Sequence, residues 1–226
     1  FCQIEALAVI PQLHQCCISK IVYHFGMFLL AVMGVCNAAA ADLKPDELVR
    51  MTVDKIMYAV ETDEDIVGGD IEKTLVFVEE QVAPHFDFPR MARLAVGRAW
   101  RQATPDQRNQ IVQEFRTLLV RSYAAAFTRF KGIKIEVLPL KPSDKPEWAL
   151  VESVIKLPTA VAQPISLNYD MELTEGQWKV FDLQIDGASL IVNNRNIFQK
   201  EIQSSGIEGL IAVSYTHLTL PTTPYV

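Results

Sequence analysis

The hydrophobic pattern of this 226-residue chain changes its period at Gly132, and this change limits the folds that the chain can adopt. Before Gly132, apolar residues recur every three or four positions, which is the spacing of one face of an α-helix. After Gly132, apolar and polar residues alternate, as in strands with one buried face. Helices followed by strands predict an α+β domain in which the helices cover one face of the sheet.

Turn residues divide the helical part. Gly68 and Gly69 separate the first two predicted helices, and Thr104 with Pro105 forms the start of the longest one, as N-cap and first-turn residue. The predicted helices span about 46–61, about 70–83, a short segment from Pro89, a long segment from Pro105 to about 130, and about 193–204, the last followed by a short turn over 206–212.

The alternating part predicts an antiparallel meander of about four strands. Glu175 and Gly176 form a tight hairpin between the third strand and the fourth. The predicted strands span 133–137, 148–157, 165–173 and 178–185. One face of this sheet is apolar, and it either packs against the helices as a plain core or opens into a cavity for an apolar ligand. Composition alone favours the plain core.

Catalytic and metal-binding side chains are scarce in residues 42–213. This region contains one histidine, His85, and no cysteine, because all four cysteines precede Ala41. A histidine-based metal site and a cysteine nucleophile are therefore excluded there. The region also lacks a glycine-rich phosphate loop and the GxSxG and HExxH motifs. The sequence thus predicts neither a metal nor a cofactor, and no catalytic residues.

One enzymatic alternative depends on Asp182, which lies among apolar residues in a predicted strand. A carboxylate in apolar surroundings can have a raised pKa and act as a general base, as in a small-molecule isomerase or hydratase. Strand alternation places Asp182 on the face opposite to Phe181, Leu183 and Ile185. If those three face inward, Asp182 faces outward and cannot serve as the base.

The beginning of the chain has the order of a secretory signal peptide. Residues 25–35 are apolar but too few to cross a bilayer, and small residues follow up to Ala41. The prediction is a leader over 1–41 that includes a signal peptide at about 20–41, cleaved after Ala40 or Ala41. A single domain over 42–213 follows. Residues 214–226 are expected to be a non-native or disordered tail.

Charge is unevenly distributed after Ala41. The net charge of this part is −6, from 20 basic and 26 acidic side chains, so nucleic acid is a poor partner. Residues 84–130, however, contain eight arginines and only three acids. Such a segment predicts a local anionic contact, with ordinary surface charges as the alternative. The arginines expected to form the docking surface are Arg90, Arg93, Arg98 and Arg101.

Two long segments resemble the MlaC family of periplasmic phospholipid-binding proteins, which is also linked to toluene tolerance. They are VAPHFDFPRMARLAVGRAWRQATPDQRNQIVQEFRTLLVRSYA at 82–124 and WKVFDLQIDGASLIVNNRNIFQKEIQSSGIEGLI at 178–211. The family landmarks are Phe86-Asp87-Phe88, the Arg98–Trp100 and Thr104-Pro105 block, Trp178 through Asp186-Gly187, and Ser189–Arg195. Asn194 departs from the family pattern, in which an aromatic residue, usually Tyr, precedes the arginine.

This resemblance implies a deep apolar pocket between sheet and helices that holds the acyl chains of a glycerophospholipid. It also implies transport through the periplasm between an outer-membrane lipoprotein–porin complex and an inner-membrane ABC-transporter complex. A non-catalytic interaction module with a filled core is a further alternative. The residues expected to line the pocket are Phe115, Leu118, Leu119, Ala126, Val151, Ile155, Leu167, Tyr169, Met171, Phe181, Leu183 and Ile185.

Overall fold

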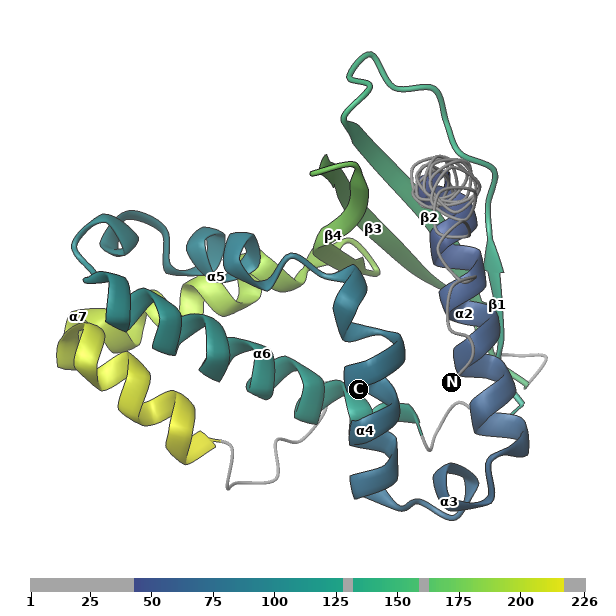
Figure 1. The fold of residues 1–226 in the computed structure, drawn as a ribbon, viewed down its shortest axis with the longest axis horizontal. Coiled ribbons are helices and arrows are strands. Elements are labelled where there is room, and N and C mark those ends of the chain that lie inside the picture. The colour runs from purple at the N-terminus through teal and green to yellow at the C-terminus, as the bar shows by residue number, and fades with distance from the viewer. Residues whose placement is uncertain (1–42, 128–131, 159–162, 218–226) are drawn as a thin grey trace, which may run out of the picture. The chain divides into compact units, whose positions relative to one another are not determined.

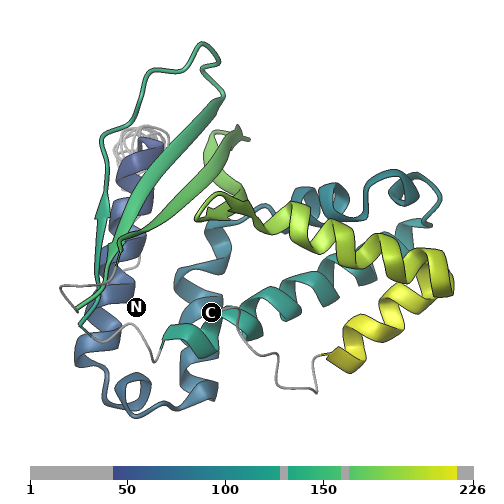
Figure 2. The same ribbon diagram turned by 180° about the vertical axis from the view of Figure 1, so that it is seen from behind.

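The structure is a computed structural model that describes residues 43–127, 132–158 and 163–217, and Figures 1 and 2 show it from two opposite sides. Contacts divide the chain into Phe1–Asp42 and Leu43–Val226, and all described residues belong to the second unit. The predicted leader and most of the predicted tail lie outside the described residues. No helix of the described part is long and apolar enough to cross a membrane.

Helices and one sheet follow each other in the predicted order. The first part contains α2 (Pro45–Thr62), α3 (Glu64–Val67), α4 (Ile71–Gln81), the 3-10 helix η1 (Ala83–His85), α5 (Phe88–Val96), the 3-10 helix η2 (Gly97–Arg101) and α6 (Pro105–Phe127). The second part contains β1 (Lys134–Val137), β2 (Trp148–Lys156), β3 (Ile165–Thr174), β4 (Gln177–Ile185), β5 (Ala188–Ser189) and α7 (Leu190–His217).

The start of α6 is held by the predicted cap. The backbone N–H of Gln107 donates to the Thr104 hydroxyl at 3.2 Å, and the Thr104 N–H donates to the Gln107 side chain at 2.9 Å. This reciprocal pair satisfies two of the N–H groups that a helix leaves open at its beginning. The predicted α+β fold is thus confirmed in its local signals as well as in its order of elements.

The structure differs in detail from three sequence predictions about the elements. The second helix ends at Gln81, because Pro84 interrupts it and the chain continues as η1. The turn predicted over 206–212 is helical: Gly206, with φ +71°, kinks α7, and the helix then resumes. Finally, the sheet has five strands, because β5 adds two residues after a turn at Asp186 and Gly187.

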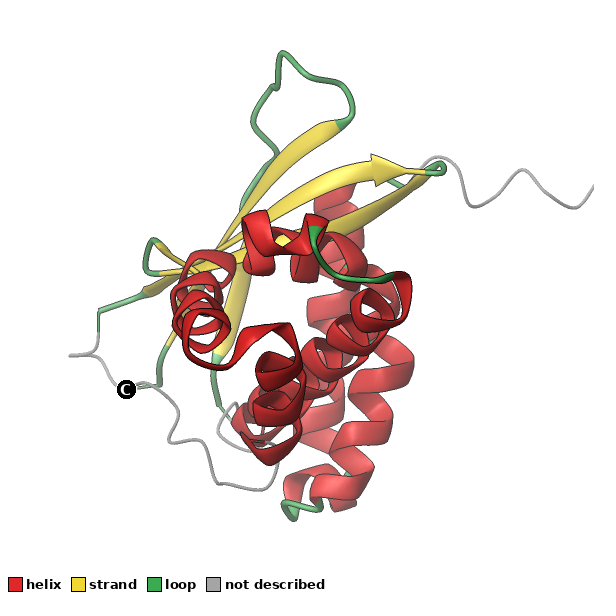
Figure 3. Ribbon diagram, turned by 90° about the vertical axis from the view of Figure 1, so that its left-hand side faces the viewer, coloured by secondary structure: helices red, strands yellow, loops and turns green. Residues whose placement is uncertain are grey.

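The sheet is an antiparallel meander with the order β1-β2-β3-β4-β5. Glu175 and Gly176 both have positive φ, at +51° and +75°, as the predicted tight hairpin requires. The register of β3 against β4 shifts between Asp170 and Met171, so a bulge interrupts the alternation. Figure 3 shows the helices gathered on one side of this sheet.

Two groups of buried apolar residues form the interior. One lies among α4, α5, α6 and α7, together with the end of α2. The other packs the beginning of α2 against the sheet. Met57, Phe86 and Leu183 contact both groups. The helical core and the sheet core therefore meet along a narrow seam, and the side chains at this seam form the candidate site.

Candidate functional site

The face of the sheet that points toward α2 is tightly sealed at one end. Four side chains at this end are at most 3% exposed to solvent: Ala149, Val151, Met171 and Val180. They pack against Leu48, Val49 and Val53 of α2. In the strand register Met171 pairs with Ala149 and Val180, so the three form one continuous row across the sheet. This end is an ordinary hydrophobic core, and it has no room for a ligand.

The same face becomes less well covered farther along the strands. Tyr169 lies opposite Val151 and Leu183, and Leu167 lies opposite Ser153 and Ile185. Four residues of this stretch are half-buried, although Val151 and Ser153 beside them are sealed: Ile155, Leu167, Tyr169 and Leu183. In a packed core, interior apolar side chains are normally not exposed to solvent at all. This stretch, called here the half-covered wall, consists of Ile155, Leu167, Tyr169 and Leu183.

The helices contribute further half-buried apolar residues near the seam. Ile56 and Met57 of α2 and Leu118 of α6 pack only partly against the helical core. Sequence reasoning missed Ile56 and Met57, although their place in the apolar stripe of α2 was visible. Phe86, which contacts both cores, was recognised only as part of a family landmark.

The predicted lining residues thus divide into groups with different surroundings. Phe115 and Leu119 are buried in the helical core, where the Phe115 ring meets Phe198 edge-on at 5.5 Å. Val151 and Met171 belong to the sealed end of the sheet. Ile185, at the end of β4, is 38% exposed. The side chain of Ala126 lies outside the described part of the structure.

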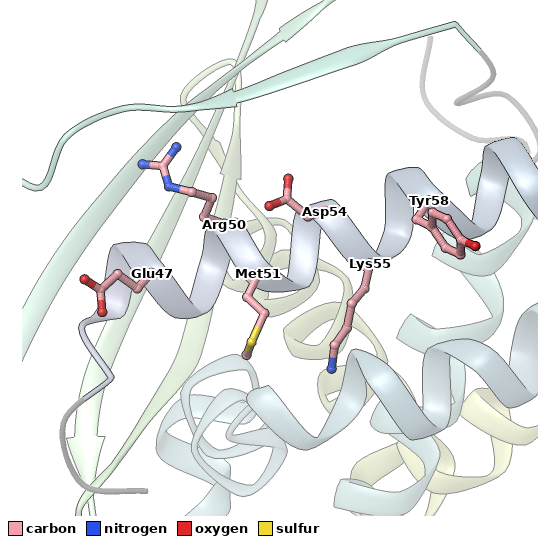
Figure 4. A pocket seen from close by; sticks show the side chains of 6 residues that line it. All are labelled: Glu47, Arg50, Met51, Asp54, Lys55 and Tyr58. Atoms are coloured by element: carbon pink, nitrogen blue, oxygen red, sulfur yellow. The ribbon is translucent and has the colours of Figure 1, made fainter. Parts of the chain in front are cut away.

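Neither of two hollows on the described surface is lined by a predicted lining residue. Figure 4 shows the first, of about 550 Å³, along one exposed face of α2. Its lining is mostly charged: Glu47, Arg50, Met51, Asp54, Lys55 and Tyr58. The second, of about 310 Å³, lies between α2 and β1 and is lined largely by charged residues as well. A site for acyl chains is instead lined mainly by hydrophobic and aromatic residues.

The half-covered wall carries one pair of hydroxyl groups. The Ser153 hydroxyl donates to the backbone carbonyl of Leu167 at 2.9 Å, and Ser153 itself is 1% exposed. Tyr169 lies diagonally across from Ser153 on the same face. Burial raises the pKa of Tyr169 to about 12, and the nearby Ser153 hydroxyl acts in the opposite direction. Tyr169 therefore keeps its proton and remains a hydrogen-bond donor.

Arg90 differs from the other three arginines of the predicted docking surface. It forms an ion pair with Glu172 of β3, and its guanidinium carbon lies 3.9 Å from the centre of the Phe181 ring. Desolvation by burial lowers the pKa of Arg90. This side chain thus joins α5 to the sheet instead of pointing freely into solvent. Arg93, Arg98 and Arg101 are exposed.

Asp182 lies on the face of the sheet opposite to Tyr169 and Leu183, which excludes it as a base at the inward face. Phe181, a predicted lining residue, lies at the bulge, and its ring meets Arg90 instead. The Asp182 carboxylate accepts hydrogen bonds from the N–H groups of Leu183 and Ile191, at 2.9 and 3.0 Å, and from the Ser189 hydroxyl at 2.5 Å. The Ser189 hydroxyl in turn accepts from the N–H of Val192. Asp182 thus stabilises the beginning of α7, and the proposed catalytic role for it was wrong.

Asp170, directly opposite Asp182 on β3, is only 9% exposed. It accepts a hydrogen bond of 2.7 Å from the side chain of Gln184. Burial raises the pKa of Asp170, and the charge of Asp182 raises it further, against the effect of Gln184. Within the described residues no group of three or more His, Cys, Asp and Glu side chains could hold a metal ion.

His85 is half-buried at the end of η1, near two lysines. The ammonium group of Lys179 donates to the carbonyl of Pro84 at 2.6 Å, and that of Lys55 donates to Gln81 at 3.2 Å. Burial and these two positive charges lower the pKa of His85. His85 is therefore a partly buried structural residue at the end of η1.

The segments that carry the family resemblance hold the helices to the sheet. Asp87 caps α5 through the N–H of Arg90 at 2.9 Å, and its own N–H donates to the carbonyl of Val180 at 2.9 Å. Arg195 donates from Nε to the carbonyl of Leu94 at 2.9 Å, which ties α7 to α5. Asn194, the residue that departs from the family pattern, donates to the carbonyl of Leu190 in its own helix.

Comparisons with known proteins agree with this arrangement. A family model described as MlaC protein matches residues 50–213. The intermembrane phospholipid transport system binding protein MlaC of Haemophilus influenzae is 22% identical over 186 residues, which cover 81% of this chain and 86% of that protein. A phospholipid-binding protein from Ralstonia solanacearum, solved in complex with a phospholipid, superposes with a TM-score of 0.71 and 28% identity. The match covers 82% of this chain and all of that one.

Proposed function

This chain belongs to the MlaC family, and we propose that it carries a glycerophospholipid through the periplasm with the acyl chains held against the half-covered wall. The protein is a non-enzymatic lipid carrier of that family. The observation that supports the proposed site is the incomplete burial of Ile155, Leu167, Tyr169 and Leu183 in the interior of the fold. A filled core, as expected of a pure interaction module, would bury these side chains as completely as Val151 and Met171.

The energetics of lipid transfer explain the need for such a wall. Burying one methylene group contributes about 0.8 kcal/mol, so two acyl chains with roughly 30 methylenes would lose on the order of 20 kcal/mol in water. A carrier avoids this loss if apolar side chains replace water around the chains, while the polar headgroup stays near the surface. The half-covered wall and the half-buried residues Ile56, Met57 and Leu118 are suited to this role.

The partners proposed for the carrier are an outer-membrane lipoprotein–porin complex and an inner-membrane ABC-transporter complex. Each must be engaged transiently, because the carrier has to leave one before it reaches the other. The exposed arginines of α5 and η2, Arg93, Arg98 and Arg101, support docking to an anionic surface, since no ion pair is seen for them among the described residues. The leader over 1–41 is proposed to direct export to the periplasm.

Native mass spectrometry of protein prepared from the periplasm tests the proposed function. Phospholipid is expected to co-purify with the protein at a defined ratio, and the delipidated protein is expected to take up lipid from vesicles. Protein that is always empty, and that takes no lipid from vesicles, would show that the chain is not a carrier. Location of the protein outside the periplasm would contradict the proposed site of transport.

A further inference from the structure

The inward face of the sheet is almost entirely apolar. From Ile135 of β1 to Ile185 of β4, strand alternation places aliphatic and aromatic side chains on this face. The exceptions among the described strand residues are the hydroxyl groups of Ser153 and Tyr169. Ligand sites of this kind use a few polar groups in an apolar lining to fix the orientation of the ligand.

The two hydroxyl groups have unequal freedom to bind a ligand. Ser153 is almost completely buried, and its proton is already used in the hydrogen bond to the carbonyl of Leu167. Its remaining capacity is that of an acceptor. Tyr169 belongs to the half-covered wall, so a ligand held against this wall lies beside its side chain. When the Tyr169 hydroxyl donates to a ligand, Ser153 keeps its own bond to Leu167, so the Ser153 donor is not left unpaired.

A glycerophospholipid offers acceptors at one place within its apolar part, namely the ester carbonyls that join the acyl chains to glycerol. We propose that the Tyr169 hydroxyl donates a hydrogen bond to such a carbonyl, and that the protein therefore prefers ester-linked phospholipids to ether-linked ones with the same headgroup and chain length. This inference rests on the proposed function, because it assigns a residue role within the same site.

A competition experiment tests the preference. Delipidated protein is incubated with vesicles that contain equal amounts of diester and diether phosphatidylglycerol of equal chain length, and the bound lipid is extracted and quantified. A hydrogen bond between neutral groups corresponds to a preference of about 2- to 12-fold for the diester. Tyr169→Phe, which removes the hydroxyl and keeps the ring, is expected to bring the ratio to about 1. Ser153→Ala is expected to keep the preference, because Tyr169 remains.

Tyr58→Phe is the matched control, since Tyr58 is 71% exposed on α2, away from the wall. It should leave the diester preference unchanged. A wild-type ratio near 1, or an unchanged preference in Tyr169→Phe, would overturn the inference while leaving the carrier function intact. Wild-type protein that takes up neither lipid would instead contradict the carrier function and, with it, this inference.

A second measurement does not depend on the folding of the Tyr169→Phe variant. Diester lipid labelled with ¹³C at its carbonyl groups is bound to the wild-type protein, and its carbonyl stretch is recorded by infrared difference spectroscopy. A band at the lower frequency of hydrogen-bonded carbonyls is expected for the bound lipid, and this band should persist in Ser153→Ala. A bound lipid with only the frequency of free carbonyls would contradict the proposed hydrogen bond.

Discussion

At the scale of single residues, two carboxylates show how position changes the role of one residue type. Asp182 and Asp170 face each other on β4 and β3, on the side of the sheet away from the half-covered wall. Asp182 is held by three hydrogen-bond donors, two of them at the beginning of α7. Asp170 has one donor, Gln184, and is more deeply buried. The Asp182 carboxylate therefore stabilises the folded state, whereas the negative charge of Asp170 destabilises it.

Asp170→Asn is expected to stabilise the protein at neutral pH. The pKa of Asp170 is raised in the folded state, so its contribution to stability is fully present below the unfolded-state pKa and is lost as pH rises through the folded-state pKa. The amide carries no charge to bury and none to repel Asp182, while its oxygen can still accept from Gln184. The free energy of unfolding should rise by about 0.2–1 kcal/mol at pH 7, as for a relieved like-charge pair across strands.

Urea unfolding of the wild type and of Asp170→Asn, at pH 7 and again below pH 4, measures this effect. The difference should shrink at the lower pH, because protonation of Asp170 removes its charge in the wild type. Asp144→Asn, in an exposed loop, is the control and should change little at either pH. A variant that is less stable than wild type at pH 7 would show that the Asp170 charge is favourable in the fold.

At the scale of elements, the segment from α5 through η2 has two distinct roles. Arg90 connects α5 to the sheet through Glu172 and the ring of Phe181. Arg93, Arg98 and Arg101 belong to the same segment but are exposed. The sequence shows four arginines at short spacing and cannot distinguish between them, because the partners of Arg90 come from strands that lie about 80 to 90 positions later. The docking prediction therefore stays with the three exposed arginines.

Reversing the charge of Arg93 and Arg98 to Glu is expected to slow association with the inner-membrane complex and to leave lipid binding intact. Exposed charges act mainly on the association rate, and salt screens them, so the loss should be about tenfold or more at low salt and much smaller at high salt. Surface plasmon resonance at two salt concentrations measures the rates, and native mass spectrometry measures the lipid retained.

Arg50→Glu is the matched control for this experiment, because Arg50 is an exposed arginine on α2. It should change association less than the double variant does. Equal association of wild type and double variant at every salt concentration would show that these arginines do not take part in docking. Loss of the bound lipid in the double variant would place them in the lipid site instead.

At the scale of the whole described domain, the important feature is the unequal covering of one sheet face. The beginning of α2 seals Ala149, Val151 and Met171, whereas the half-covered wall lies where the sheet core meets the helical core. An aliphatic side chain that remains half-exposed in the interior gives up part of its favourable packing. A bound acyl chain would restore those contacts, so the ligand would complete the core.

Two substitutions with the same new side chain test this difference. Leu167→Trp, in the half-covered wall, is expected to fill space that the lipid uses, so that lipid uptake falls at least tenfold and stability changes by less than about 1 kcal/mol. Val151→Trp, in the sealed end, has no free space and should destabilise the protein by about 3 kcal/mol. Chemical denaturation and uptake from vesicles measure the two effects.

Equal destabilisation by the two substitutions would mean that Leu167 lies in a filled core, as in the interaction-module alternative. Normal lipid uptake by Leu167→Trp would show that the acyl chains do not bind at this wall. Because the half-buried and the sealed residue lie on neighbouring strands of one sheet face, the comparison separates space for a ligand from general tolerance to substitution.

Local signals in the sequence were sufficient for the order of the elements. The change of period at Gly132, the Thr104 cap and the Glu175-Gly176 hairpin depend on residues close together in the chain, and the structure confirms each of them. The same reasoning placed Asp182 outside the inward face. It failed at Gly206, since a glycine with positive φ can end a helix or only kink it, and contacts elsewhere decide which.

Only the tertiary structure decided which apolar residues are sealed and which are partly open. Val151 and Leu167 have the same alternating pattern around them, and the pattern records only that each faces inward. Whether such a side chain is covered depends on where α2 packs against β1 and β2 and where α5 and α7 meet β4, which is set by contacts between residues far apart in the sequence. For the same reason the pairing of Arg90 with Glu172, and the meeting of Tyr169 with Ser153, could be found only in the folded protein.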